Sequence, residues 1–124
     1  LNDLVMPETN LKETISNIKG RKIIYTNAPK SYTDRILKIS NIYEMFDEVF
    51  TIEDSDFMPK PNQGSMANFL KKYNINEGVF IDDIKENLKT AKNFGLTTIW
   101  ITNEITHHSF IDRKIEKISD LLTF

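Results

Sequence analysis

Three short apolar runs set the strongest limit on how this chain can fold. Residues 22–26 read KIIYT, residues 78–81 read GVFI, and residues 97–101 read TTIWI. The runs are continuous rather than alternating, which is typical of strands that are covered on both faces in a parallel sheet. Each run is closed by polar or turn-forming residues, so the predicted strands stop where polar groups begin.

The segments between these runs carry apolar residues at helical spacing. Helices are predicted in four segments: 8–19, 31–40, 62–73 and 84–93. Thr9 or Asn10 is the expected N-cap of the first helix and Gly20 its stop, while Asn62 is a good N-cap for the third. The side chains expected to face inward from the second helix are Tyr32, Ile36, Leu37 and Ile39.

A further strand is predicted over 46–52, and the tail is expected to add a short strand and a final helical turn. Strands that alternate with helices of this length favour an α/β fold, in which a Rossmann-like parallel sheet carries helices on both faces. Trp100 and the phenylalanines are expected in the core rather than on a stacking surface.

Composition bounds the class of protein. The 124 residues are 40% hydrophobic, enough for one core, so we expect a single domain over 1–124. The 16 basic and 18 acidic residues are interspersed, which disfavours nucleic acid or a membrane as partner and favours a small solute. There is no cysteine, as is common in the cytoplasm, and apolar stretches of about five residues fall far short of a membrane span.

Three polar features follow or lie near the ends of predicted strands. They are Thr26, Lys60 and the pair Asp82-Asp83. The carboxyl ends of parallel strands meet at one edge of a sheet, so we expect these groups to lie together there. Two adjacent carboxylates need a cation nearby, and oxygen ligands suit Mg²⁺, while a hydroxyl, backbone N–H groups and a lysine would hold phosphate oxygens.

Each feature also has an ordinary structural interpretation. Asp83 and Glu86 have the spacing of a capping box, although this leaves Asp82 unexplained. Thr26 with Asn27 could form a simple turn, and a lysine before proline is commonly solvated. His107 and His108 are adjacent in a polar stretch and do not converge on one ion, so we interpret them as a solvated loop.

The motifs taken together resemble those of the haloacid dehalogenase superfamily. Residues 23–28 are similar to its second motif, Lys60-Pro61 to its third, and 80–83 followed by Asn87 to its fourth, in family order. The Thr-Asn form of the second motif resembles the branch of pyrimidine 5'-nucleotidases, whose pattern continues with His and Leu. Here those two positions are Tyr32 and Leu37.

This resemblance implies Mg²⁺-dependent hydrolysis of a small phosphorylated substrate, such as a nucleoside monophosphate, through an aspartyl-phosphate. By carry-over, Thr26 and Asn27 bind the phosphoryl group, and Lys60 steadies its charge. Asp83 ligates Mg²⁺, with Asp82 binding the ion directly or lying just behind it, and Asn87 supports the pair. Thr26 and Lys60 are thus the expected catalytic residues of this chain.

The family also needs a first motif, D-x-D-x-T, whose first aspartate is the nucleophile, and no such motif is present. Residues 53–57 contain D-x-D but lie between the second and third motifs, so we reject them as the nucleophile. We therefore interpret the chain as a core fragment holding the second to fourth motifs, inactive alone, with the first strand, nucleophile and cap expected before Leu1.

Other interpretations stay open or are discounted. A degenerate, non-catalytic module that binds phosphate or Mg²⁺ remains the alternative. A response-regulator receiver domain is discounted, because there the acidic pair comes first and the phosphoacceptor lies mid-chain. Loss of a first strand would leave an open sheet edge or a central gap, so we expect self-association or a complementing N-terminal segment.

Overall fold

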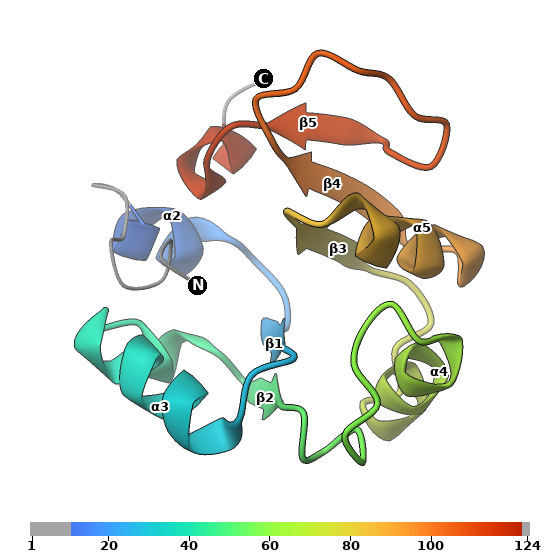
Figure 1. Cartoon of the computed structure of the whole chain (residues 1–124). Helices are drawn as coiled ribbons and strands as arrows, with labels where there is room; N and C mark the ends of the chain where they lie inside the picture. Colours follow the sequence, from blue (N-terminus) through green and yellow to red (C-terminus); the bar gives the residue numbers. More distant parts are fainter. Residues whose placement is uncertain (1–10, 123–124) are drawn as a thin grey trace.

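A computed structural model describes residues 11–122 (Figure 1). In chain order these residues form α2 (Leu11–Asn17), β1 (Ile23–Tyr25), α3 (Lys30–Ile39), the 3-10 turn η1 (Tyr43–Met45), β2 (Glu48–Phe50), α4 (Gln63–Lys72), β3 (Val79–Asp82), α5 (Lys85–Asn93), β4 (Thr97–Ile101), β5 (Arg113–Ile115) and the 3-10 turn η2 (Ile118–Leu122).

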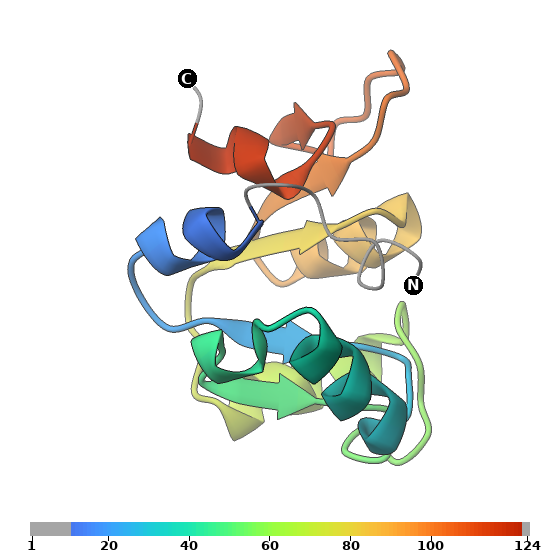
Figure 2. The same ribbon diagram turned by 90° about the vertical axis from the view of Figure 1, so that its left-hand side faces the viewer.

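The described strands form two parallel sheets. β1 pairs with β2, and β4 lies between β3 and β5. Helices α2 and α3 lie on one side of the strands and α4 and α5 on the other (Figure 1). The predicted α/β class, Rossmann-like with helices on both faces, is therefore confirmed. All the strands run in one direction, so their carboxyl ends share an edge (Figure 2).

β1 and β3 each have one edge that pairs with no described strand. Both views show them side by side and pointing the same way, with a space between their ribbons (Figures 1 and 2). β1 was predicted to be covered on both faces, but all three of its residues are only half-buried, and Val79 of β3 is 58% exposed. No described strand lies against these two edges, which explains the incomplete burial.

Two apolar clusters hold the layers together. The larger joins α4 and α5 to strands of both sheets and contains Phe50, Met66, Phe69, Tyr73, Phe80, Leu88, Ala91, Leu96 and Trp100. The smaller lies under α2 and α3 and contains Leu11, Ile15, Leu37 and Ile42. The ring of Tyr25 links β1 to the larger cluster, with centroid distances of 5.1 Å to Phe50 and 4.4 Å to Phe69.

Several predicted boundaries and faces differ from the structure. The first helix ends at Asn17 instead of Lys19, and its predicted N-cap, Thr9 or Asn10, lies outside the described residues. Ile39 was expected to face inward but is 65% exposed, because it closes the last turn of α3 on the side away from the core.

The phenylalanine prediction holds only in part. Phe50, Phe69 and Phe80 are buried together with Trp100, as expected. Phe57 is 68% exposed, because it lies in the turn beyond β2 and on no strand or helix face.

The predicted N-cap at Asn62 is confirmed, since its Oδ1 accepts a hydrogen bond of 2.8 Å from Ser65 N. We expect Asn62→Ala to lower the free energy of unfolding by about 1 kcal/mol, because a first-turn N–H loses its acceptor. Urea denaturation measures this change. Gln63→Ala, at an exposed neighbouring position, is the control and should change it by less than about 0.5 kcal/mol. Equal effects of both substitutions would contradict the cap.

Candidate active site

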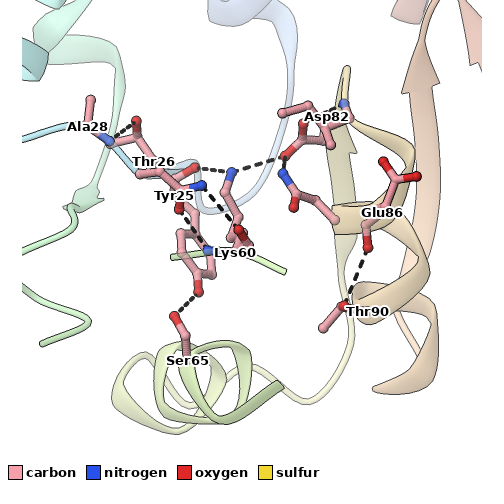
Figure 3. Close-up of polar contacts among 11 residues, drawn as sticks. Tyr25, Thr26, Ala28, Lys60, Ser65, Asp82, Glu86 and Thr90 are labelled. Carbon is pink, nitrogen blue, oxygen red and sulfur yellow. Dashed lines mark hydrogen bonds and ion pairs between the residues drawn. The ribbon is translucent and has the colours of Figure 1, made fainter. Parts of the chain in front are cut away.

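Lys60 connects the carboxyl ends of the two sheets. Its Nζ donates to Tyr25 O at 2.8 Å, at the end of β1, and to Asp82 Oδ2 at 3.0 Å, at the end of β3 (Figure 3). The side chains of Lys60 and Asp82 are only 9% and 8% exposed. The ammonium also lies 5.0 Å from the ring centroid of Tyr25 and 5.6 Å from that of Phe80, a cation–π arrangement.

An ammonium group carries three N–H donors, and two of them are used by these acceptors. Within residues 11–122 the third has no hydrogen-bond acceptor. Lys60 therefore holds the two sheets together and keeps one donor for a further oxygen at this edge.

Asp82 is a buried carboxylate with three donors. Its Oδ1 accepts from Ile84 N at 2.9 Å, and its Oδ2 accepts from Asn87 Nδ2 at 3.1 Å as well as from Lys60. Asn87 is 2% exposed, so its amide orients the carboxylate from within α5. A buried charge needs such pairing to offset its lost hydration. The predicted supporting position of Asn87 thus lies directly against Asp82.

Thr26 follows β1 at the same edge. Its backbone N–H donates to Phe50 O at 2.9 Å, and its hydroxyl accepts from Ala28 N at 3.1 Å, which closes a short turn (Figure 3). The hydroxyl hydrogen has no acceptor in the described part of the chain. The turn interpretation is therefore correct, and it leaves the O–H of Thr26 able to donate.

Asn27 contacts the loop that carries Lys60. Its Oδ1 accepts from Lys60 N at 2.8 Å and its Nδ2 donates to Lys60 O at 3.3 Å. Sequence reasoning gave Asn27 a phosphate-binding role and missed this paired contact, because the two residues are far apart in sequence. The amide side chain fixes the backbone from which Lys60 reaches both sheets.

Tyr25 is a second contributor that the sequence did not reveal. Its carbonyl accepts from Lys60, its ring lies under the ammonium, and its hydroxyl is hydrogen-bonded to Ser65 of α4. Burial raises the pKa of the Tyr25 phenol, and the hydrogen bond to Ser65 offsets only part of this rise. Tyr25 therefore stays neutral and acts as a fixed support.

Asp83 is exposed beside Asp82. The capping-box interpretation of Asp83 and Glu86 is wrong, because α5 has Ile84 at its N-cap position without a side-chain cap hydrogen bond. The carbonyl of Asp83 accepts from Trp100 Nε1 at 3.0 Å. The backbone at Asp83 is thus held from β4 while its carboxylate lies at the surface.

Asp82 and Asp83 are the neighbouring carboxylates that could contribute to a metal site. Residues 11–122 contain no group of three or more His, Cys, Asp or Glu side chains placed to hold an ion. Asp82 and Asp83 nevertheless supply the oxygen chemistry that Mg²⁺ takes, and Mg²⁺ fills most of its positions with water and substrate phosphate. The pair therefore fits part of a Mg²⁺ site, with Asp83 the more accessible member.

The other candidate groups have structural roles. Asp54, of the rejected D-x-D, accepts from Thr51 N at 2.8 Å and from Thr51 Oγ1 at 3.1 Å, which closes the turn after β2. His107 is exposed, but His108 is half-buried, with ring centroids 5.2 Å from Phe110 and 5.6 Å from Trp100. The solvated-loop interpretation is thus wrong for His108, because the loop folds back onto Trp100.

The sequence profile of the haloacid dehalogenase-like hydrolases matches residues 1–101. The chain belongs to this family. The resemblance drawn from Thr26, Lys60 and Asp82-Asp83 is thereby confirmed at the level of the superfamily, and the arrangement of these residues at one sheet edge agrees with it.

Solved structures of this family share the fold. A HAD phosphatase from Thermococcus onnurineus is 25% identical, with a TM-score of 0.75 and coverage of 93% of this chain and 55% of that one. The HAD hydrolase YfnB from Bacillus subtilis, bound to magnesium, is 22% identical, with a TM-score of 0.79 and coverage of 90% and 52%.

A Saccharomyces cerevisiae protein named Phosphate metabolism protein 8 is 25% identical in an alignment of 117 positions, and the alignment covers 77% of this chain and 35% of the yeast protein. The chain thus spans about half the length of the matched structures and about a third of the yeast relative. Among the helices of residues 11–122, none is long and apolar enough to span a bilayer.

Lys60 and Asp82 should be strongly coupled in stability. We expect Lys60→Met to lower the free energy of unfolding by about 3–5 kcal/mol, because Asp82 then stays buried without its cation. The double variant Lys60→Met/Asp82→Leu should lose less than the sum of the single losses in a double-mutant cycle. Lys92→Met is the control, because the Lys92–Asp112 pair is 33% and 43% exposed and should contribute less than about 1 kcal/mol. Additive losses at Lys60 and Asp82 would refute the coupling.

Proposed function

We propose that this chain carries the phosphate- and magnesium-binding part of a HAD-type phosphatase that hydrolyses a small phosphomonoester. Over 1–124 it holds the second to fourth motifs of a single core. The observation that carries the proposal is the buried Lys60–Asp82 pair, which brings a lysine donor, Asp82-Asp83 and Thr26 to one edge of the fold.

The phosphoryl group is held by donors that the fold leaves unused. Lys60 offers its third N–H and Thr26 offers its O–H, both at the carboxyl edge. A phosphoryl group in transfer spreads negative charge over its oxygens, and preorganised donors stabilise that charge without reorganisation. In this proposal, Asn27 has two roles. Its side chain fixes the backbone of Lys60, and it also contributes to binding of the phosphate.

Asp83 and Asp82 would hold Mg²⁺, with Asp83 as the direct ligand. The bound ion would supply charge neutralisation at the phosphate oxygens and a fixed orientation for the substrate. The Asp82 carboxylate also accepts hydrogen bonds from Lys60 and from the backbone N–H of Ile84, so it connects the proposed metal site to the phosphate donors. Asn87 of α5 donates to the same carboxylate and holds it in this orientation.

The attacking carboxylate belongs to a strand that fits between β1 and β3. β1 and β3 lie side by side and run in the same direction (Figure 2), each has an edge that pairs with no described strand, and Lys60 donates to the carboxyl ends of both. An aspartate at the carboxyl end of such a strand would lie beside the Lys60 ammonium. A complementing segment that carries the first motif would supply this strand, and without that segment the chain by itself would be inactive.

A nucleoside monophosphate is the proposed substrate class. The Thr26-Asn27 and Leu37 positions match the pyrimidine 5'-nucleotidase pattern, while Tyr32 replaces its histidine. The name of the yeast relative, Phosphate metabolism protein 8, supports phosphate chemistry in general. Tyr32 is the third residue of α3, and the Cζ atom of Arg35 lies 5.7 Å from the centroid of the Tyr32 ring.

The test is Mg²⁺-dependent hydrolysis of p-nitrophenyl phosphate and uridine 5'-monophosphate. Two proteins are compared, this chain and a product that also includes the sequence encoded immediately upstream of Leu1. We expect turnover by the longer product only. In that product, Lys60→Met should lower kcat by about 100-fold, as expected for loss of one charge-stabilising donor, while Lys89→Met on the exposed face of α5 should not.

Two outcomes would contradict the proposal. Robust turnover by this chain alone that is abolished by Asp83→Ala would show that the nucleophile is already present. Phosphate binding by the longer product without turnover of any phosphoester would favour the non-catalytic, degenerate module instead.

A further inference from the structure

We propose that Trp100 is a positioning residue for the metal-binding carboxylate of Asp83. This inference rests on the proposed function, because it assigns a role at the same magnesium site. It concerns a side chain on β4, a strand that contributes no ligand of its own to the proposed site.

The contact is a single directed hydrogen bond. The indole Nε1 of Trp100 donates to the backbone carbonyl of Asp83 at 3.0 Å. In the parallel register of β3 and β4, Trp100 lies opposite Asp82, so its side chain reaches one residue beyond the paired position. The indole therefore holds the chain at the point where it leaves the sheet.

The Trp100 contact acts on the backbone of Asp83, whereas the contacts of Asp82 act on its side chain. The Asp82 side chain is fixed directly by Lys60, Ile84 and Asn87. Asp83 is exposed, and the direction of its Cα–Cβ bond is set by the peptide planes on either side of its Cα atom. A fixed carbonyl at Asp83 fixes one of those planes.

Trp100 is itself immobile. It is 2% exposed and belongs to the larger apolar cluster with Phe80 and Leu88. The His108 ring packs edge-on against it with a centroid distance of 5.6 Å, and the Phe110 ring stacks on His108 with a centroid distance of 5.2 Å. A close-packed indole keeps one rotamer, so its N–H is aimed before any ion arrives.

The alternative is that Trp100 only fills the core. The two roles differ in whether the indole N–H is needed. Packing in the core requires only the shape of the ring, whereas positioning of Asp83 requires the N–H as a hydrogen-bond donor. Trp100 is the one tryptophan in the sequence, so global replacement of tryptophan by 3-benzothienylalanine changes this position alone. That ring keeps the shape of indole and has sulfur in place of N–H.

The experiment measures Mg²⁺ affinity of the whole chain by NMR, from the shifts of the Asp83 and Ile84 amides on titration with MgCl₂. Removing the N–H should weaken Mg²⁺ binding about 10-fold, the lower end of the cost of losing an outer-shell partner of a metal ligand. Trp100→Phe should show at least the same loss. Tyr73→Phe is the control, because Tyr73 is a buried aromatic of the same cluster at the C-cap of α4, and this change should leave the affinity unchanged even where stability falls.

The outcomes separate this inference from the proposed function. Unchanged Mg²⁺ affinity in folded benzothienyl protein would overturn the role of Trp100 and leave the magnesium site standing. An equal loss in Tyr73→Phe would show a general packing effect and also overturn it. Absence of Mg²⁺-dependent shifts in the unsubstituted chain would overturn the proposed magnesium site and this inference together.

Discussion

The buried ion pair of Lys60 and Asp82 is the interaction on which the rest of the structure depends. β1 and β3 exchange no backbone hydrogen bonds, so Lys60 joins their carboxyl ends by donating to Tyr25 O at 2.8 Å and to Asp82 at 3.0 Å. Such a pair is costly to bury, and it is maintained by Asn87, Ile84 N and the ring of Tyr25. A protein that needed only stability would gain as much from apolar residues there, which favours a chemical role for the pair.

In the proposed function, the edge of the fold around this pair combines phosphate binding with metal binding. The proposed donors for a phosphoryl group are Thr26, which follows β1, and Lys60, which lies in the loop beyond β2. The proposed carboxylates for a cation are Asp82, the last residue of β3, and Asp83, which follows it. Asp82 belongs to both sets, because it accepts from Lys60 and precedes Asp83. β1 and β3 each have an edge that pairs with no described strand, and the proposal assigns the strand with the attacking carboxylate to these edges.

Features set by local sequence could be predicted, and features set by distant contacts could not. The cap at Asn62, the end of β3 at Asp82 and the order of Thr26, Lys60 and Asp82 follow from neighbouring residues and from parallel-sheet geometry. The contacts of Asn27 with Lys60 and of Trp100 with Asp83 join segments far apart in the chain, and no spacing rule indicates them. Ile39 and Phe57 were misjudged because apolar character alone does not show which surface lacks a neighbour.

The central claim is that the edge around Lys60 binds phosphate, and titration with inorganic phosphate in the presence of Mg²⁺ tests it most directly. With ¹⁵N-labelled chain, the Thr26 amide and the Lys60 ammonium signal should shift together and saturate at one dissociation constant. Lys114, whose ammonium donates to the carbonyls of Glu104 and Thr106 away from this site, should not follow them. Shifts at Lys114 without shifts at Thr26 and Lys60, or no saturable shift at Lys60, would contradict the account.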